Sequence, residues 1–199
     1  LTFSKIEMKQ MRISVRKGDI MHFLEELSHI FDIVAGEREI DFIVNLEDTE
    51  EEVWFSPSKL ERILYNLLSN AFKYTQPGGY VKLRAKLIKE EKETFVQISV
   101  KDNGRGIPKE AQEQIFESYH QVEKRDHREG FGLGLSLTRS LIHMHKGEIR
   151  VESEVNEGSD FIVTLNVSED AYGPDERSSE NITTEEIQKY NQRIKETIE

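Results

Sequence analysis

The sequence predicts an α/β sandwich of the α+β class, in which one mixed, mostly antiparallel sheet of about five strands packs against three helices. Helical and strand-like patterns alternate irregularly along the chain, which is typical of a mixed fold. The strand-like segments 80–89 and 94–102 follow each other closely and predict a hairpin, which excludes an all-parallel sheet. Residues 117–131 hold few apolar side chains and predict a long loop, which in a compact domain often acts as a lid.

The predicted helices have apolar residues recurring at helical spacing. They are expected at residues 20–35, 57–74 and about 132–145, with a shorter one near 108–116. Asp19 is a plausible N-cap for the first helix. Ser56 and Pro57 predict the start of the second, as a hydroxyl cap followed by proline in the first turn.

The predicted strands have alternating or β-branched and aromatic residues. They are expected at residues 12–16, 40–46, 53–55, 80–89, 94–102, 148–153 and 160–167. A turn containing Asn156 and Gly158 is expected to join the last two strands.

The chain divides into three parts by composition. We expect the last turns of a helix that began upstream over residues 1–11, a compact domain over 12–168, and an acidic linker with a C-terminal helix over 169–199. Thr183 and Glu186 form a capping-box pattern at the start of that last helix. A narrow apolar stripe follows, made of Ile187, Tyr190, Ile194 and Ile198. The stripe needs a partner, which is either this domain or a neighbouring one. Because the first residue is Leu1 rather than methionine, we expect the chain to be a piece of a longer protein.

Composition excludes several functional classes. The 199 residues carry a formal net charge of -11, and because nucleic acid requires a basic surface, no direct nucleic-acid binding is expected. The absence of cysteine excludes disulfides and thiolate metal sites. No apolar run approaches the roughly 20 residues that span a bilayer, and no signal peptide is visible.

A polar stripe lies on the predicted helix 57–74. Asn66, Asn70 and Lys73 stand at positions i, i+4 and i+7 and therefore share one face. Asparagine is a poor residue for a helix interior, which favours a functional site. An amide oxygen can bind Mg²⁺ and a lysine can meet a phosphate. Taken alone, the stripe fits an exposed polar face without a role equally well.

The first glycine segment, residues 102–107, directly follows a predicted strand. Gly104 and Gly106 allow a tight turn and a close approach of the backbone to a ligand, and Asp102 can accept a proton from an amino group. An ordinary turn at a strand end explains the segment as well, because such sequences are common there.

The second glycine segment, residues 130–135, opens a predicted helix. Glycines before a helix N-terminus expose backbone N–H groups and the positive end of the dipole, which suits phosphate. The segment matches neither the P-loop pattern nor G-x-G-x-x-G, since position 135 is leucine. The loop before it holds basic residues that could neutralise phosphate, namely Lys124, Arg125 and Arg128.

Together these segments resemble the ATPase module shared by histidine kinases, gyrase, Hsp90 and MutL. The matching segments are residues 66–74 for the N box, 102–107 for the first glycine box, 115–117 for the start of the F box, 130–135 for the second glycine box and 157–161 for a weaker final glycine box. One box could arise by chance, but all of them in this order are very specific. The resemblance covers roughly residues 12–167. Residues 1–9, with the segment 3–7, resemble the end of the dimerisation helix of histidine kinases, which implies that residues 1–11 are the end of that helix.

The resemblance implies a Mg-ATP site under a long ATP lid. It implies that Asn70 binds Mg²⁺, that Asn66 supports the same polar cluster, and that Lys73 and Tyr74 lie near the phosphates. Asp102 would bind the adenine amino group. The remaining expected nucleotide-binding residues are Gly104, Gly106 and Ile107 in the first glycine segment, and Arg128, Gly130, Gly132, Leu133 and Gly134 in and before the second.

The resemblance also implies an activity and partners. The chain would donate the γ-phosphoryl group of ATP to a histidine on a separate dimerisation domain of the same two-component sensor kinase. No histidine here precedes the Glu/Asp and Pro pattern of an acceptor site, so the chain is not expected to be its own substrate. A downstream receiver domain or response regulator, a homodimeric full-length protein, and a cytoplasmic domain of an inner-membrane sensor are further expectations.

Departures from the family pattern keep more than one function open. Gln121 stands where many members have a basic residue, and Phe131 where a small or hydroxyl residue is usual. An ATP hydrolase of the same superfamily would need a glutamate four residues before the Mg²⁺-binding asparagine, where this chain has Asn66. A serine kinase of the anti-sigma type is a second possible function, against which residues 3–7 argue. A non-catalytic docking module is a third, and the retained Asn70, Lys73 and Asp102 argue against it.

Overall fold

The computed structural model describes residues 12–117 and 134–198, and its centre is one five-stranded sheet. The strand order is β2 (Asp41–Leu46), β4 (Tyr80–Lys89), β5 (Thr94–Asp102), β7 (Gly158–Asn166) and β6 (Glu148–Glu154). β2 runs parallel to β4, and every other neighbouring pair is antiparallel. The predicted mixed sheet and its β4–β5 hairpin are therefore confirmed.

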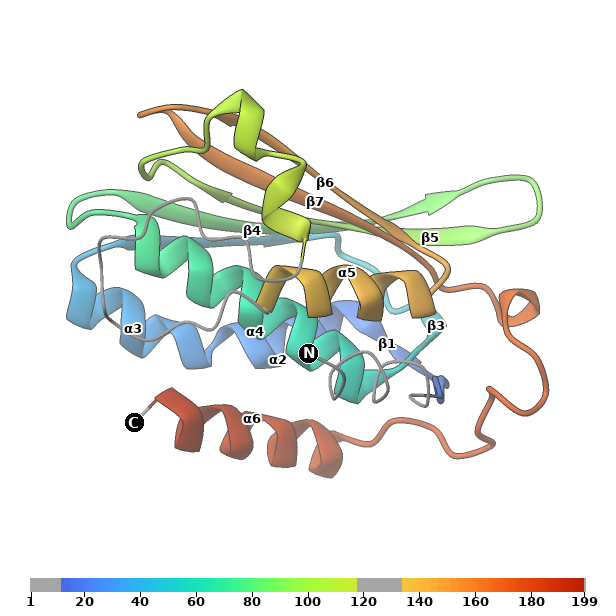
Figure 1. Cartoon of the computed structure of the whole chain (residues 1–199). Helices are drawn as coiled ribbons and strands as arrows, with labels where there is room; N and C mark the ends of the chain where they lie inside the picture. The colour runs from blue at the N-terminus through green and yellow to red at the C-terminus, as the bar shows by residue number, and fades with distance from the viewer. Residues whose placement is uncertain (1–11, 118–133, 199) are drawn as a thin grey trace, which may run out of the picture.

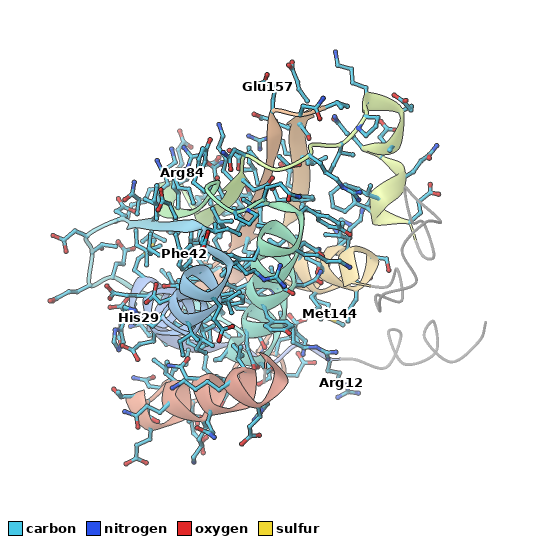
Figure 2. All side chains as sticks on the ribbon, turned by 90° about the vertical axis from the view of Figure 1, so that its left-hand side faces the viewer. Arg12, His29, Phe42, Arg84, Met144 and Glu157 are labelled. Atoms are coloured by element: carbon cyan, nitrogen blue, oxygen red, sulfur yellow. The ribbon has the colours of Figure 1, made fainter. Side chains whose placement is uncertain are left out.

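Helices cover one face of this sheet (Figure 1). They are α2 (Ile20–Ser28), α3 (Ile30–Arg38), α4 (Pro57–Tyr74) and α5 (Gly134–Met144). The sequence alternates along β4 and β5, so that Val81, Leu83 and Ile98 are buried against the helices. Figure 2 shows Phe42 of β2 on this helical side and Arg84 of β4 on the opposite face of the sheet.

The central helix α4 has its predicted bounds and supplies much of the core. Its apolar residues recur every three or four positions, which places Leu60, Leu64, Leu67 and Leu68 in the interior with at most 1% of each exposed. Burying one such side chain stabilises the fold by roughly 1.5–3 kcal/mol, so the polar stripe on the other side of α4 is rigidly supported. The predicted hydroxyl cap is wrong, because the Ser56 side chain makes no capping hydrogen bond.

The first strand and first helix differ from their predicted limits. β1 is Arg16–Asp19 rather than residues 12–16, because its partner is β3 (Glu52–Phe55), an antiparallel pairing that local pattern does not reveal. Asp19 caps α2 as predicted, accepting a hydrogen bond from the His22 N–H at 2.9 Å. The predicted helix 20–35 is interrupted at His29 and continues as α3 to Arg38. Both helices bury apolar residues of the predicted face.

Two shorter elements also differ from the prediction. The helix expected near residues 108–116 consists of two 3-10 turns, Lys109–Ala111 and Gln114–Phe116. The expected turn between β6 and β7 is present, with Asn156 and Gly158 at positive φ.

The acidic segment predicted to be a linker is packed against the domain. After the 3-10 turn Glu169–Ala171, Tyr172 is 3% exposed, and its hydroxyl donates a hydrogen bond to the carbonyl of Asn166. The Val15 N–H donates to the Glu176 carbonyl at 2.8 Å, and the Ser178 N–H donates to the Val15 carbonyl at 2.9 Å. These backbone bonds explain why a polar composition does not produce a free linker here.

The last helix, α6 (Thr184–Ile198), lies across the helical layer on the side away from the sheet (Figure 1). Its predicted capping box is present, with reciprocal bonds of 3.4 Å between Thr183 and Glu186. Ile187 and Ile194 are each 4% exposed against this domain, which therefore is the partner of the apolar stripe. In the part of the chain that the structure describes, no helix is long and apolar enough to cross a membrane.

Candidate functional site

The polar stripe of α4 contacts the start of α5. The Asn66 amide donates a hydrogen bond of 2.6 Å to the Thr138 hydroxyl, which in turn donates one of 2.8 Å to the Gly134 carbonyl. A Cβ atom on Gly134 would lie 2.5 Å from the Asn66 side-chain oxygen, so a larger residue there would require the Asn66 side chain to shift. The fold thus brings together Asn66 and Gly134, which are far apart in the sequence.

Asn70 lies one helical turn further along α4 on the same side and is half-buried. No hydrogen bond joins its side chain to any residue within 12–117 or 134–198. A half-buried amide with a free oxygen is a suitable ligand for a hard cation or a polar group of a bound molecule.

Asp102 ends β5 at the same end of the sheet as the last turn of α4. Its side chain is 4% exposed and accepts a hydrogen bond of 2.8 Å from the Gly104 N–H. Burial raises the pKa of Asp102, while the hydrogen bonds from Gly104 and Ser159 act in the opposite direction. Burial removes water from this carboxylate, so a ligand with an N–H donor would find a strong acceptor there.

The first glycine segment is fixed between the β6–β7 turn and the end of α4. Gly106 has φ +69°, and a side chain there would collide with the Glu154 carbonyl. The Ile107 N–H donates to the Ser153 hydroxyl at 2.8 Å. The Arg105 guanidinium lies 4.4 Å from the ring centre of Tyr74.

Lys73 and Tyr74 occupy the exposed C-terminal end of α4. The Lys73 ammonium group lies 5.4 Å from the ring centre of Tyr74. Four predicted site residues, Arg128, Gly130, Gly132 and Leu133, fall outside the described residues. Sequence reasoning missed Thr138 and Ser153, which hold site residues in place through hydroxyl groups; the only available signal was the position of Thr138 four residues after Gly134.

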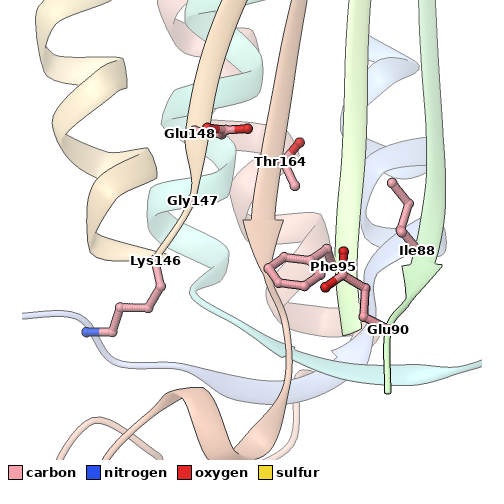
Figure 3. Close-up of a pocket in the computed structure, with 7 residues that line it drawn as sticks. All are labelled: Ile88, Glu90, Phe95, Lys146, Gly147, Glu148 and Thr164. Carbon is pink, nitrogen blue, oxygen red and sulfur yellow. The ribbon is translucent and has the colours of Figure 1, made fainter. Parts of the chain in front are cut away.

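A cavity of about 390 Å³ lies between α4, α5 and α6, and Asn66, Gly134 and Thr138 are part of its wall. A second cavity, of about 340 Å³, is lined by Ile88, Phe95 and Lys146 among others (Figure 3). It lies where β4 ends and β5 begins, whereas Asp102 is at the other end of β5, and none of the predicted site residues lines it. The first cavity is therefore the one connected to the candidate site.

The sheet, the α4 stripe and the glycine segment define a nucleotide-binding ATPase domain. Residues 55–169 match the family described as histidine kinase-, DNA gyrase B-, and HSP90-like ATPase, and the chain belongs to this family. The resemblance predicted from the boxes is thereby confirmed, and with it ATP binding as the property of the domain.

Curated relatives of this chain are histidine kinases. Histidine kinase P4 of Formosa agariphila is 32% identical over 83% of this chain and 12% of its own length. The adaptive-response sensory kinase SasA of Crocosphaera subtropica is 33% identical over 84% of this chain and 43% of its length. The sensor histidine kinase WalK of Bacillus subtilis is 32% identical over 85% of this chain and 28% of its own length. The chain spans less than half the length of each of these relatives.

Solved structures agree with the fold. The catalytic domain of histidine kinase ThkA matches with a TM-score of 0.68 and 25% identity, covering 80% of this chain and 100% of that domain. Full-length ShkA, solved in complex with AMPPNP, matches with a TM-score of 0.69 and 26% identity, covering 79% of this chain and 32% of ShkA. The predicted α/β sandwich of a histidine kinase-type catalytic domain is confirmed.

Proposed function

We propose that this chain binds Mg-ATP and donates the γ-phosphoryl group to a histidine on a separate dimerisation domain of the same two-component sensor kinase. The observation that carries the proposal is the contact of Asn66 with Thr138 and Gly134. A superfamily hydrolase would have a carboxylate at this position to activate water, and here an amide is held by a 2.6 Å hydrogen bond. An amide is a poor general base, which favours transfer to a protein acceptor.

The base of the nucleotide is assigned to Asp102, whose buried carboxylate would accept the adenine amino proton. Ile107, Gly104 and Gly106 would form the adjoining wall. The phosphates would then extend along α4 towards Asn66 and the N-terminus of α5, where Gly134 stands at the positive end of the helix dipole. Lys73 and Tyr74 are assigned to the phosphates from the exposed end of α4.

The described residues fit a magnesium site that depends on the nucleotide. They contain no group of three or more His, Asp or Glu side chains that could hold a metal ion. Mg²⁺ commonly takes one or two protein ligands together with phosphate oxygens and water, and the half-buried Asn70 amide can supply one of them. Bound Mg²⁺ would neutralise charge on the phosphate oxygens, while Asn66 and Asn70 hold the polar wall in place.

The partners follow from the same proposal. A phosphoacceptor domain of the same protein would receive the phosphoryl group and pass it to a receiver domain or response regulator. The full-length protein would be a homodimeric membrane sensor with this domain in the cytoplasm. The names of the relatives support a sensor kinase as the parent protein, because SasA is a sensory kinase and WalK is a sensor histidine kinase.

Thermal unfolding with and without nucleotide tests the binding step. Mg-ATP at 100 times its dissociation constant should stabilise the chain by about 2.7 kcal/mol, and ATP with a chelator should stabilise it less. No stabilisation by Mg-ATP would contradict the proposal. Incubation of the parent protein with γ-labelled ATP tests transfer: acid-labile, alkali-stable phosphoprotein is expected, whereas release of inorganic phosphate alone would indicate the hydrolase.

A further inference from the structure

The C-terminal helix α6 is fixed firmly on the helical layer. Tyr190 packs edge-on against Phe23 with ring centres 5.8 Å apart. Arg16 forms a two-pronged ion pair with Glu186, with both nitrogen–oxygen distances at 2.9 Å. Together with the buried Ile187 and Ile194, these contacts hold α6 against the helical layer.

The C-terminal half of α6 borders the cavity beside the candidate site. Arg193 and Ile194 line the same cavity of about 390 Å³ as Asn66 and Gly134. The segment that composition predicted to be a linker and a separate helix therefore supplies one wall of the space next to two site residues.

The orientation proposed for the nucleotide places this cavity beside its phosphate groups. Asp102 lies by the last turn of α4, and Asn66 is eight residues before Tyr74, which corresponds to about 12 Å along a helix. With its base at Asp102, a nucleotide would carry its last phosphate towards Asn66, Gly134 and the cavity that α6 closes. This step rests on the function proposed above.

The charge on this wall suits an anion. The Arg193 side chain is 65% exposed, and its guanidinium lies 5.3 Å from the ring centre of Tyr190 and 3.9 Å from the Glu61 carboxylate. At 3.9 Å the ion pair is long, and burial of Glu61 raises the pKa of that carboxyl. Arg62 and Glu61 line the same cavity, so two guanidinium groups and one carboxyl border it, a local excess of positive charge in a chain with a net charge of -11.

We propose that Arg193 of α6 binds the terminal phosphate of the bound nucleotide. A guanidinium presents paired N–H donors that match phosphate oxygens, and Arg193 lines the cavity on its α6 side. The C-terminal helix thus completes the site and distinguishes a nucleoside triphosphate from a diphosphate.

The test compares Arg193→Met with the unchanged chain. Methionine keeps an unbranched apolar stem over Tyr190 and removes the charge. Calorimetric titration should show that affinity for a non-hydrolysable Mg-ATP analogue falls roughly tenfold, as expected for loss of a charge-assisted hydrogen bond, while affinity for Mg-ADP changes less than about twofold. Arg193→Lys should restore part of the loss. Lys195→Met is the matched control on the same helix, exposed and outside the cavity wall, and should change neither affinity.

The outcomes separate the two proposals. If the unchanged chain binds neither nucleotide, the proposed function fails, and this inference fails with it. If the unchanged chain binds both nucleotides and Arg193→Met lowers both affinities equally, Arg193 has only a structural role in the cavity wall, and its proposed contact with the terminal phosphate is wrong. Equal affinities of Arg193→Met and the unchanged chain for the triphosphate would likewise refute it. Thermal unfolding without nucleotide shows whether the variant folds as the parent does.

Discussion

The Ser56 N–H donates a hydrogen bond of 3.1 Å to the imidazole Nε2 of His145, tying the start of α4 to the end of α5. His145 is fully buried, and its Nδ1 lies 3.0 Å from the Leu141 carbonyl. Because Nε2 accepts, Nδ1 carries the proton and donates to Leu141, so the ring is neutral. This hydrogen bond therefore links the two helices that carry Asn66 and Gly134.

Acid should therefore destabilise the domain through His145. Burial lowers the pKa of His145 from 6.5 to about 4, with a smaller effect of Lys59 in the same direction. The unfolded chain takes up this proton first, so the stabilisation is complete above pH 6.5 and is lost as the pH falls towards 4. The loss is on the order of 3 kcal/mol from this group. Urea unfolding at several pH values should show the loss. It should be absent in His145→Gln, which is less stable at neutral pH, and retained in the control His143→Gln, whose ring is exposed.

Gly134→Ala should weaken nucleotide binding by displacing Asn66. The new methyl group would lie 2.5 Å from the Asn66 oxygen, so the amide must leave Thr138 or α5 must shift. Displacing the amide removes its hydrogen bond to Thr138, worth about 0.5–1.5 kcal/mol, and affinity for Mg-ATP should fall by up to roughly tenfold. Titration of the purified variant measures the affinity.

The matched control for that change is Gly36→Ala. A Cβ atom on Gly36 has no neighbour within 4 Å, and the residue lies inside α3. The substitution should stabilise the chain by about 0.5–1 kcal/mol and leave nucleotide affinity unchanged. If Gly134→Ala bound Mg-ATP as tightly as Gly36→Ala, the contact with Asn66 would have no part in binding.

Local pattern predicted most of the fold, and long-range contacts account for the rest. β4 and β5 match their predicted limits because alternation and a turn are local signals. β1 was misplaced because its limits depend on pairing with residues 52–55. The segment 169–182 looked like a linker because acidic composition carries no sign of backbone bonds to Val15. A pattern of apolar residues predicts which side chains are buried. It does not predict which distant segment of backbone pairs with a given strand or loop.

The site was predictable in its residues but not in its assembly. Asn66, Asn70 and Asp102 stood out by residue type and spacing, yet their joint meaning required the family resemblance. Thr138 was missed because its spacing of four residues from Gly134 does not predict a contact with Asn66 on another helix. The place of α6 beside the cavity depends on tertiary packing, which one sequence does not reveal.

Asn70→Ala should abolish binding of Mg-ATP while the domain still folds. Asn70 is half-buried and its amide has no hydrogen-bond partner in the described ranges, so truncation should change the free energy of unfolding by about 1 kcal/mol or less. Circular dichroism and thermal unfolding check the fold, and titration with Mg-ATP checks binding. An unchanged nucleotide affinity would exclude Asn70 as the metal ligand.

Asn66→Glu should raise the rate of ATP hydrolysis, because a carboxylate at this position can accept a proton from water. The site can hold it: the Thr138 hydroxyl, 2.6 Å from the Asn66 amide, can turn its O–H from the Gly134 carbonyl to a carboxylate, and the N-terminus of α5 favours the ionised form. Asn66→Gln is the matched control, since it has the length of glutamate without its charge and should hydrolyse ATP no faster than the unchanged chain. Phosphate release at saturating Mg-ATP compares the three proteins. Equal rates for the Glu and Gln variants would mean that no water is positioned beside residue 66, and the distinction between phosphotransfer and hydrolysis would then lie elsewhere in the site.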